Sequence, residues 1–441
     1  MLKHICTLLL IILISKHIEA QSFNKSKMDS LFDVLAKNER GMGSVALSKN
    51  GVLIYQRAIG FTEINGTRRV PATISTKYRI GSITKMFTAS LIFQLVEDKK
   101  LTLSTPLATF FPQVPNANKI TISQLLNHHS GIHNFTNDSV YETYMEQPKS
   151  RDEMVKIIAG ATPDFAPDST GEYSNSNYVL LGYIIEDIYK KPYAAVLKEK
   201  IIDKIGLKNT YAAPNKEAKD APIFSYKYIN NWEQETVTDM SIPGGAGNIM
   251  ATPTDLVKFI EALFAGKIVS EASLEQMKTI RDHYGMGMFS FPFGNHQFYG
   301  HTGGIDGFTS SLGICPADGL SVAYCTNGAR YPMNDIMIGV LSIYYKQPYH
   351  LPDFKTIPVA PEELDQYTGV YANPEVPLKI TISKEGQGLK AQATGQPSFP
   401  LEAAARHRFK FDAGGIVMEF NLEEHELKLI QGGGSYVFRK E

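Results

Sequence analysis

Cysteine and tryptophan are scarce in this chain, which has three cysteines and one tryptophan among its 441 residues. So few cysteines exclude a small scaffold held together by disulfides, and a hydrophobic content of 43% is enough for a conventional core. Cys315 and Cys325 flank a turn at residues 316–319. A hairpin centred on that turn pairs Cys315 with Leu320 instead of Cys325, so we expect two buried free thiols and no disulfide.

An excess of charge of one sign is also absent, because the formal net charge is −1. That balance gives no reason to expect nucleic acid or an anionic membrane as a partner. The sequence has no internal repeat and no low-complexity tract. Its length predicts roughly two or three domains of ordinary globular type.

An apolar run at residues 5–14 follows Lys3 and His4 and precedes Ala20, a small residue suited to cleavage. The run is too short to span a bilayer comfortably. We therefore predict a signal peptide over residues 1–20 and an exported protein, periplasmic or extracellular, with no stable membrane insertion after cleavage. Ile18 is an unusual residue at position −3 of such a site, and an uncleaved anchor is the alternative.

The segment 21–346 has strand patterns near both ends and helical patterns between them. This order predicts an α+β domain whose sheet is built from both ends of the segment, with the helices inserted. Strands are predicted at 44–47, 52–59, 308–314 and 320–326, and helices at 27–38, 82–97, 334–345 and over much of 101–263.

A change in composition follows this segment. Residues 347–361 contain four prolines and read as a linker. Residues 362–441 alternate in the manner of short strands and predict a small antiparallel barrel or sandwich. The predicted strands are 367–371, 378–383, 389–393, 408–411, 416–422, 426–430 and 436–438.

Ser82 and Lys85 stand at the start of an apolar helical run, in the sequence Gly81-Ser82-Ile83-Thr84-Lys85. A spacing of three residues puts the hydroxyl and the amine on one helix face, one turn apart. That is the arrangement a serine nucleophile needs if lysine is to take its proton. The helix N-terminus also favours a developing negative charge.

Two later clusters supply further polar groups. Tyr173 and Asn175 lie in a polar turn before a helical run, and His301-Thr302-Gly303-Gly304 precedes a strand pattern. Each pattern is weak alone, since Ser-x-x-Lys recurs at Ser22 and Tyr-x-Asn recurs at Tyr228. Context selects among the copies, and together the three clusters indicate an acyl-transferring serine hydrolase.

The three clusters, in this order, resemble those of the penicillin-recognising serine hydrolases: class C β-lactamases, D-alanyl-D-alanine carboxypeptidases and their esterase and aminopeptidase relatives. Residues 125–132 and 244–248 also resemble family segments, and the resemblance covers residues 25–346. It implies a β-lactamase-like fold, with an antiparallel sheet flanked by helices and an all-helical lobe. Residues 362–441 resemble the small lipocalin-like modules appended to such hydrolases.

The resemblance also implies a role for each residue. Ser82 would form the acyl-enzyme, and Lys85 would either accept its proton or hold Tyr173 in a reactive state. Tyr173 would pass a proton to the leaving group, and Asn175 would orient Lys85 and the substrate. His301, Thr302 and Gly303 would line the strand beside the substrate. The backbone N–H groups of Ser82 and Gly304 would form the oxyanion hole.

One departure from the family pattern concerns His301, which stands where many β-lactamases have lysine. It replaces a permanent cation by a group that titrates near pH 6.5. Some carboxypeptidases and aminopeptidases of the family have histidine here. The sequence also lacks the glutamate motif that drives deacylation in class A enzymes. We therefore expect β-lactams to acylate the protein and to be turned over slowly.

The expected activity is that of a D-alanyl-type carboxypeptidase or a β-lactamase-like hydrolase. The expected substrate is a small peptide, amide or ester, with a D-alanyl-type peptide from cell-wall material favoured. The alternatives within enzymes are a small-ester hydrolase and a D-aminopeptidase. A different class of alternative is a catalytically silent binding or sensor protein, in which residues 362–441 would read the ligand. We favour a role in which these residues prop the catalytic domain, that is, stabilise it by packing, or limit access to its cleft.

Other side chains suggest no cofactor and no metal. His128, His129 and His133 lack the His-Glu-x-x-His arrangement, and two adjacent histidines do not easily share one ion. The glycines at 244–247 lack the Lys-Ser/Thr of a phosphate-binding loop, and we expect a flexible loop at the rim of the site. Trp232 is either a substrate platform or a packing residue.

Overall fold

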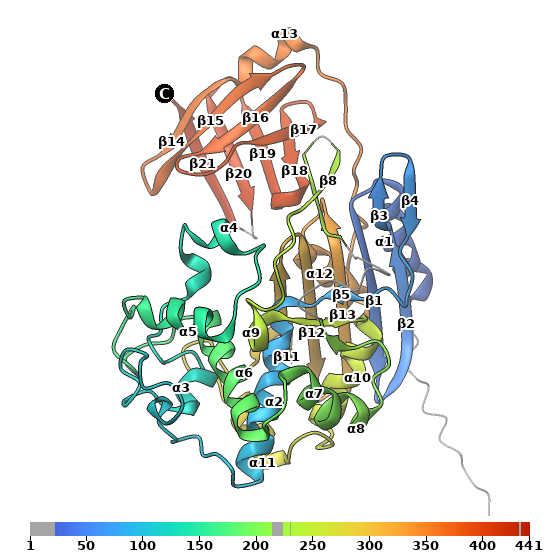
Figure 1. Cartoon of the computed structure of the whole chain (residues 1–441). Coiled ribbons are helices and arrows are strands. Elements are labelled where there is room, and N and C mark those ends of the chain that lie inside the picture. The colour runs from blue at the N-terminus through green and yellow to red at the C-terminus, as the bar shows by residue number, and fades with distance from the viewer. Residues whose placement is uncertain (1–22, 214–223, 230, 432–433) are drawn as a thin grey trace, which may run out of the picture.

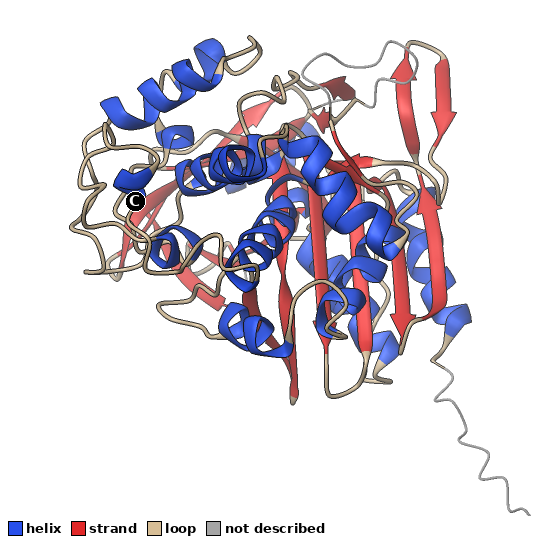
Figure 2. Ribbon diagram, turned by 60° about the horizontal axis from the view of Figure 1, so that its bottom comes forward, coloured by secondary structure: helices blue, strands red, loops and turns tan. Residues whose placement is uncertain are grey.

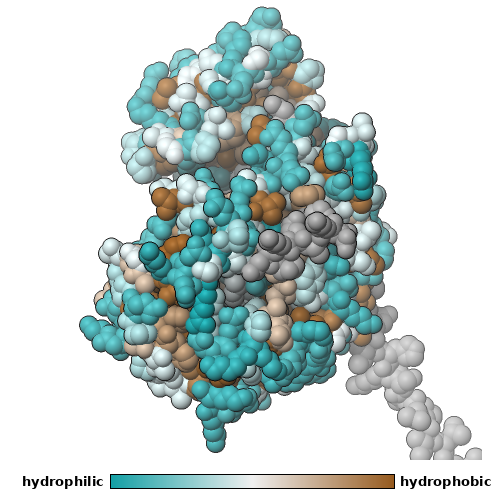
Figure 3. Space-filling model, viewed as in Figure 1, coloured by the Kyte–Doolittle hydropathy of each residue, from teal (hydrophilic) through white to brown (hydrophobic). Residues whose placement is uncertain are grey.

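The computed structural model describes residues 23–213, 224–229, 231–431 and 434–441 (Figure 1). The predicted signal peptide at residues 1–20 lies outside this part of the chain. Within the described residues, no helix combines the length and the apolar composition that crossing a membrane requires. On the face drawn in Figure 3, hydrophobic residues are scattered among hydrophilic ones and do not form one continuous patch.

A six-stranded antiparallel sheet is the centre of the larger part of the molecule, with the strand order β10-β11-β12-β13-β1-β2. Strand β1 pairs with β13 so that Val45 lies opposite Tyr324, which joins the two ends of the segment as predicted. The strands are β10 Phe289–Phe293, β11 His296–Ile305, β12 Phe308–Cys315, β13 Leu320–Ala329, β1 Gly41–Lys49 and β2 Val52–Ile59.

Both faces of this sheet are covered by helices (Figure 2). Val322 and Tyr324 on β13 pack with α1 (Lys25–Lys37) and α12 (Met333–Tyr344). Their neighbour Ala323 points the other way, into the core that also contains residues of α2 (Thr84–Glu97), α6 (Asn175–Tyr189) and α10 (Pro253–Phe264). The alternation follows from the two-residue period of a strand. Every residue from Leu320 to Gly328 is buried, as a strand between two helical layers must be.

The remaining helices form the lobe inserted between β2 and β10. Local capping fixes several of their starts. Thr121 and Ser150 make capping boxes with Gln124 and Glu153, and Thr252 caps α10 ahead of Pro253. These helices are α3 Ile122–Leu126, α4 Tyr141–Tyr144, α5 Arg151–Gly160, α7 Tyr193–Leu197, α8 Asp203–Ile205, α9 Gly244–Gly247 and α11 Glu271–Lys278.

Short strands complete this part of the fold. They form two hairpins, β3–β4 and β7–β8, and a small sheet of order β5-β9-β6. Their bounds are β3 Phe61–Asn65, β4 Arg68–Pro71, β5 Tyr78–Arg79, β6 Tyr211–Ala212, β7 Tyr226–Tyr228, β8 Trp232–Gln234 and β9 Ile249–Ala251. Trp232 therefore lies on a hairpin strand, half-buried.

The C-terminal strands close into an eight-stranded antiparallel barrel, which confirms the predicted fold class. The barrel core contains Tyr367, Tyr371, Phe409, Phe420 and Phe438. Helix α13 (Pro361–Leu364) precedes it. The strands are β14 Gly369–Asn373, β15 Val376–Glu385, β16 Gly388–Ala393, β17 Phe399–Ala405, β18 Arg408–Phe411, β19 Ile416–Asn421, β20 Glu426–Gln431 and β21 Gly434–Lys440.

Candidate active site

The three sequence clusters meet where α2, α6 and β11 approach one another. Ser82 lies in a 3₁₀ turn, Gly81–Ile83, and not in the helix as predicted; α2 begins two residues later at Thr84. Lys85 is in the first turn of α2, and Asn175 is the first residue of α6. The Lys85 amine lies 2.9 Å from Ser82 Oγ and 2.7 Å from Asn175 Oδ1.

Lys85 is fully buried, and its Nζ has a third partner, the main-chain oxygen of Ala246 at 2.9 Å. Burial holds the pKa of Lys85 well below its usual value. A neutral amine has two N–H bonds and one lone pair. Since the oxygens of Asn175 and Ala246 can only accept, the lone pair is left for the Ser82 hydroxyl. This arrangement suits an amine that removes the hydroxyl proton.

Tyr173 lies beside this pair, with the Lys85 amine 4.9 Å from its ring centroid. Burial raises the pKa of the Tyr173 phenol, although a hydrogen bond with Ser82 opposes the shift. The phenol therefore keeps its proton at neutral pH. His128 packs on the Tyr173 ring, with 4.5 Å between centroids, and burial holds the pKa of His128 well below its usual value.

His301 is buried between Phe289 and Tyr173, with ring centroids 4.3 Å and 6.3 Å away. Its Nδ1–H donates to the Thr302 carbonyl. Burial, aided by the nearby Lys85, lowers the pKa of His301 to about 3. The expectation that His301 titrates near pH 6.5 is therefore wrong, because the sequence does not reveal how completely its ring is desolvated.

The other residues of that cluster bring β11 against the serine turn. A side chain at Gly303 would meet the Ile80 carbonyl at 2.0 Å, and one at Gly81 would meet the Gly304 nitrogen at 2.8 Å. Both glycines are therefore required by close backbone approach. Gly304 lines the same cleft as Ser82. Thr302 is exposed on the strand.

Several supporting residues were missed by the sequence analysis. Asn134 Oδ1 accepts from the main-chain N–H of Asn175, and Thr136 Oγ1 accepts from the Asn175 side chain at 3.1 Å. These contacts orient the amide that holds Lys85. The loop around Asn134 and Thr136 has no sequence signal of its own, because its role depends on a helix start about forty residues later.

The glycine run at 244–247 was predicted to be a flexible loop at the rim of the site. Ala246 and Gly247 do line the cleft with Ser82, but the prediction of a loop is wrong. The run forms the short helix α9, most of it buried against α6. A side chain at Gly245 would meet the Tyr178 carbonyl at 2.6 Å, so glycine permits this packing. The helix in turn places the Ala246 carbonyl on the Lys85 amine.

The three histidines considered as metal ligands have other partners. His129 Nε2 lies 2.9 Å from Asp282 Oδ2, and His133 lies between Asp164 and Asp138. His128 Nδ1 accepts from the main-chain N–H of Ser174 at 3.1 Å. These rings therefore brace the loops around Tyr173 instead of converging on one point.

A cleft of about 240 Å³ opens onto Ser82. Its apolar wall includes Phe135, Tyr141, Met145 and Ile305. Asp306 is the one charged residue among the described residues that line it. Its carboxylate accepts hydrogen bonds from Arg79 at 3.1 Å and from the Thr238 hydroxyl at 2.6 Å. The cleft therefore offers a small, largely uncharged site beside the serine.

Known proteins share this arrangement of elements. The family model described as Beta-lactamase matches residues 28–339. A putative penicillin-binding protein, PbpX, from Bacillus subtilis is 30% identical over 58% of this chain and 64% of its own length, so the chain spans just under two thirds of that relative. Teichoic acid D-alanine hydrolase from Staphylococcus aureus is 27% identical over 63% of this chain and 67% of its own length.

A solved structure agrees with these matches. The D-amino acid amidase from Ochrobactrum anthropi SV3 is 25% identical and superposes with a TM-score of 0.65, covering 73% of this chain and 98% of the amidase. Because the family model spans well over half of the chain, the predicted family is confirmed. The chain belongs to the beta-lactamase family, within the penicillin-recognising serine hydrolases.

Proposed function

We propose that this protein is an exported serine hydrolase that forms an acyl-enzyme at Ser82 on small amide or peptide substrates with a D-amino acyl group. The observation that carries the proposal is the buried Lys85 amine, 2.9 Å from the Ser82 hydroxyl and held by two oxygens that can only accept. The D-amino acyl preference rests on the relatives, two of which are named for D-alanine or D-amino acid hydrolysis.

In the proposed reaction, Ser82 Oγ attacks the carbonyl carbon and its proton passes to Lys85. The oxyanion accepts hydrogen bonds from the main-chain N–H groups of Ser82 and Gly304, and losing one such donor typically costs ~3–4 kcal/mol of barrier. Tyr173 then protonates the leaving nitrogen, the C–N bond breaks, and Lys85 returns a proton to Tyr173. Water cleaves the acyl-enzyme in the reverse sense.

The cleft favours uncharged groups on the substrate. None of the described residues lining it is a lysine, arginine or histidine that could pair with a terminal carboxylate. Its one carboxylate, Asp306, is already bound by Arg79 and Thr238, so it is poorly placed to pair with a free amine. We therefore favour amides and neutral peptides over carboxypeptidase substrates, D-aminopeptidase substrates and simple esters, which remain the alternatives.

The first test is intact-protein mass spectrometry after incubation with a fluorescent penicillin or a fluorophosphonate. We expect a covalent adduct on the wild type and none on Ser82→Ala. Ser90→Ala is the control, because Ser90 is a buried serine of α2, the helix that follows the Ser82 turn, and its hydroxyl donates to the Met86 carbonyl within that helix. No adduct with either probe on folded wild-type protein would favour the binding or sensor alternative.

A second experiment separates the substrates. N-acetyl-D-alanine amide, D-alanine amide, D-alanyl-D-alanine peptides, their L-enantiomers and short p-nitrophenyl esters would be compared by kcat/KM. The proposal expects the neutral amide of D-configuration to lead, ahead of the free-amine amide and the peptides with a terminal carboxylate. Hydrolysis of esters alone would contradict the amide preference while leaving the Ser82 mechanism intact.

A further inference from the structure

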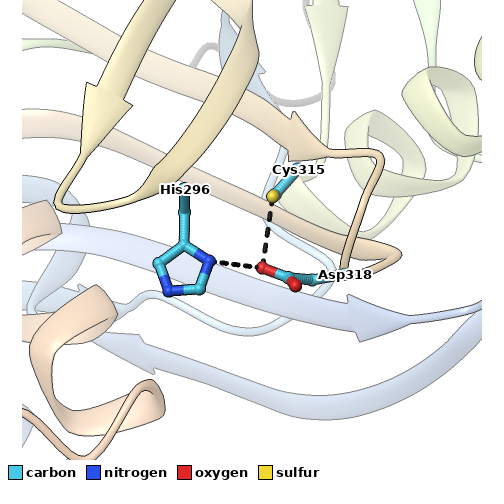
Figure 4. Close-up of side chains that lie close together, drawn as sticks. All are labelled: His296, Cys315 and Asp318. Atoms are coloured by element: carbon cyan, nitrogen blue, oxygen red, sulfur yellow. Dashed lines mark hydrogen bonds and ion pairs between the residues drawn. The ribbon is translucent and has the colours of Figure 1, made fainter.

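Three side chains with metal-binding atoms gather at the end of the large sheet away from Ser82 (Figure 4). His296 begins β11, Cys315 ends β12, and Asp318 lies in the turn between β12 and β13. Their ligand atoms all lie within 4.8 Å of one another. His296 is five residues from His301 on the same strand, about 17 Å at a rise of roughly 3.3 Å per residue.

The Asp318 carboxylate is the centre of the cluster. Its Oδ2 lies 2.7 Å from His296 Nδ1 and 3.2 Å from Cys315 Sγ, and it also accepts from the Tyr345 hydroxyl at 2.7 Å. One oxygen thus holds three groups around a common point. Cys315 and Asp318 are three residues apart in one tight turn, which resembles the close spacing of ligand pairs in zinc sites.

The surroundings hold these ligands in place. The Tyr345 ring stacks on His296 with 3.8 Å between centroids, so its ring and its hydroxyl each fix one ligand. The Asn50 N–H donates to the Gly319 carbonyl, and Lys49 donates to the Asp318 carbonyl, which ties the turn to the neighbouring hairpin. Cys315 is buried, but His296 and Asp318 retain 29% and 27% side-chain exposure, which leaves an approach for an ion.

We propose that His296, Cys315 and Asp318 form a binding site for a divalent transition-metal ion, with Zn²⁺ the best match. One sulfur, one imidazole nitrogen and one carboxylate oxygen are zinc ligands, and the thiolate excludes Ca²⁺ and Mg²⁺ as preferred ions. The ion displaces the thiol proton, giving a zinc–thiolate bond and one released proton. Two anionic ligands then balance its charge, and water completes four-coordination.

The site would join the β10–β11 and β12–β13 turns next to the C-terminal end of α12. It goes beyond the sequence prediction of no metal, which considered only the histidines near Tyr173. The site is independent of the hydrolase proposal, because its distance from Ser82 leaves the ion no part in the chemistry.

The test uses full-length protein freed of metal by dialysis against a chelator, with Zn²⁺ alone as the probe and a chromophoric chelator as competitor. We expect one equivalent to bind and to raise the Tm of the wild type. Cys315→Ser and His296→Asn each remove a ligand. Tyr345→Phe removes only the outer hydrogen bond and should weaken binding about 10–100-fold. Cobalt substitution should give a thiolate charge-transfer band that is absent in Cys315→Ser.

The control is His350→Asn, which removes an exposed histidine and should bind zinc as the wild type does. Because Cys315 is buried, Cys315→Ser could fail to fold, and circular dichroism would show this. In that case zinc binding by His296→Asn decides, because His296 is partly exposed and its substitution disturbs the core less. Failure of the wild type to bind one equivalent at micromolar zinc would overturn the proposal. Unchanged affinity in His296→Asn would overturn it as well.

Discussion

At the scale of single residues, the candidate site is defined by burial. Lys85, His128 and His301 are all basic side chains with little contact with water, and burial lowers the pKa of each. Tyr173 is an acid whose pKa burial raises. All four shifts favour the uncharged form, so a lysine base and a phenol acid can coexist a few ångströms apart at neutral pH.

Tyr173→Phe tests the proposed division of roles, in which Lys85 is the base and Tyr173 the acid. The substitution keeps the ring that packs on His128 and removes the proton donor. We expect kcat for an amide to fall by ~10²–10⁴-fold, the usual contribution of a general acid or base. The burst of p-nitrophenol from a p-nitrophenyl ester, which reports acylation alone, should be affected much less, because that leaving group needs no proton.

Tyr284→Phe is the matched control for this experiment. Tyr284 belongs to the same aromatic group, 6.3 Å from Tyr173 between centroids, but is not assigned a proton transfer. Its variant should behave as the wild type does with both substrates. Equal losses in amide turnover and in the ester burst rate of Tyr173→Phe would instead place Tyr173 in the attack of Ser82, as the shared-proton alternative requires.

The buried His301 predicts a pH dependence of stability. Its folded-state pKa of about 3 lies below its usual value of 6.5, so between these values the unfolded chain binds a proton that the folded protein does not. Stability should therefore fall as the pH falls from about 6.5 towards 3, by up to ~1.4 kcal/mol per pH unit for one such group. His301→Asn removes this contribution.

The measurement is the free energy of unfolding in urea at several pH values between 4 and 7.5 for wild type and His301→Asn. The free energy of unfolding of the variant should fall less steeply than that of the wild type as the pH falls. His128 contributes to this slope in both proteins. His350→Asn, at an exposed position, should leave the wild-type slope unchanged. A variant with the wild-type slope would mean that His301 is charged in the folded protein.

At the scale of elements, the serine turn depends on how closely β11 approaches it. Gly81 has a φ of +50°, and a side chain there would meet both the nitrogen and the oxygen of Gly304 at 2.8 Å. Gly81→Ala should therefore separate the two proposed oxyanion donors, and we expect kcat to fall by at least ~10²-fold. Steady-state kinetics with N-acetyl-D-alanine amide would measure the change.

Gly66→Ala separates this effect from backbone strain. Gly66 has a similar φ of +58° in the β3–β4 turn, and a side chain there would meet nothing within 4 Å. Both variants should lose about 1–2 kcal/mol of stability from left-handed backbone. Only Gly81→Ala should lose activity. If both kept full activity, the approach of β11 would have no part in oxyanion binding.

The sequence predicts those elements whose signals are local, and it misses those that depend on packing between distant segments. The helix starts at Thr121 and Thr252 can be recognised from the sequence, because capping is an interaction between residues close together in the chain. Strand β17 was missed, because Pro400 and three consecutive alanines at 403–405 weaken its β pattern. Helix α9 was missed because its glycines signal a loop until packing against α6 is known. The contacts of Asn134 and Ala246 depend on segments distant in sequence, which no local pattern encodes.

At the scale of the whole molecule, the barrel is joined to the large sheet by an ionic cluster. Arg40, at the start of β1, lies 2.9 Å from Glu402 and 3.0 Å from Asp412 of the barrel. Arg330, after β13, lies 3.2 Å from the other oxygen of Glu402. The main-chain N–H of Ile357 also donates to Ala403, which extends β17 towards the linker. These contacts support a propping role for residues 362–441.

The continuation of this cluster reaches the rim of the catalytic cleft. The Arg330 guanidinium lies over the Tyr228 ring, 3.5 Å from its centroid, and Tyr228 belongs to the β7–β8 hairpin. Ser225, just before that hairpin, accepts from the main-chain N–H of Gly307, next to Asp306. A change at Glu402 can therefore affect both the barrel junction and the position of the hairpin.

Glu402→Gln is the variant that tests this junction. It keeps the shape of the side chain but leaves Arg40, Arg330 and Lys410 with one carboxylate, that of Asp412, where there were two. The Arg40 side chain is only 7% exposed, while that of Glu402 is 32% exposed. The variant should therefore lose ~1–3 kcal/mol of its free energy of unfolding, which is more than a surface ion pair contributes and less than a fully buried one. Trp232, the one tryptophan, lies on β8 near the junction. Its fluorescence during urea unfolding would measure the free energy of unfolding of the variant and the wild type.

The matched control is Glu63→Gln, which breaks a 3.6 Å pair with Arg68, an arginine that is 71% exposed. It should change stability by less than ~0.5 kcal/mol. If Glu402→Gln lowers stability and leaves kcat/KM unchanged, the barrel props the catalytic domain. A change in KM at unchanged stability would instead favour a barrel that limits access to the cleft through the β7–β8 hairpin. A variant equal to Glu63→Gln in both measurements would leave neither role with support from this junction. Among the described barrel residues, Glu402 is the one that pairs with both Arg40 and Arg330.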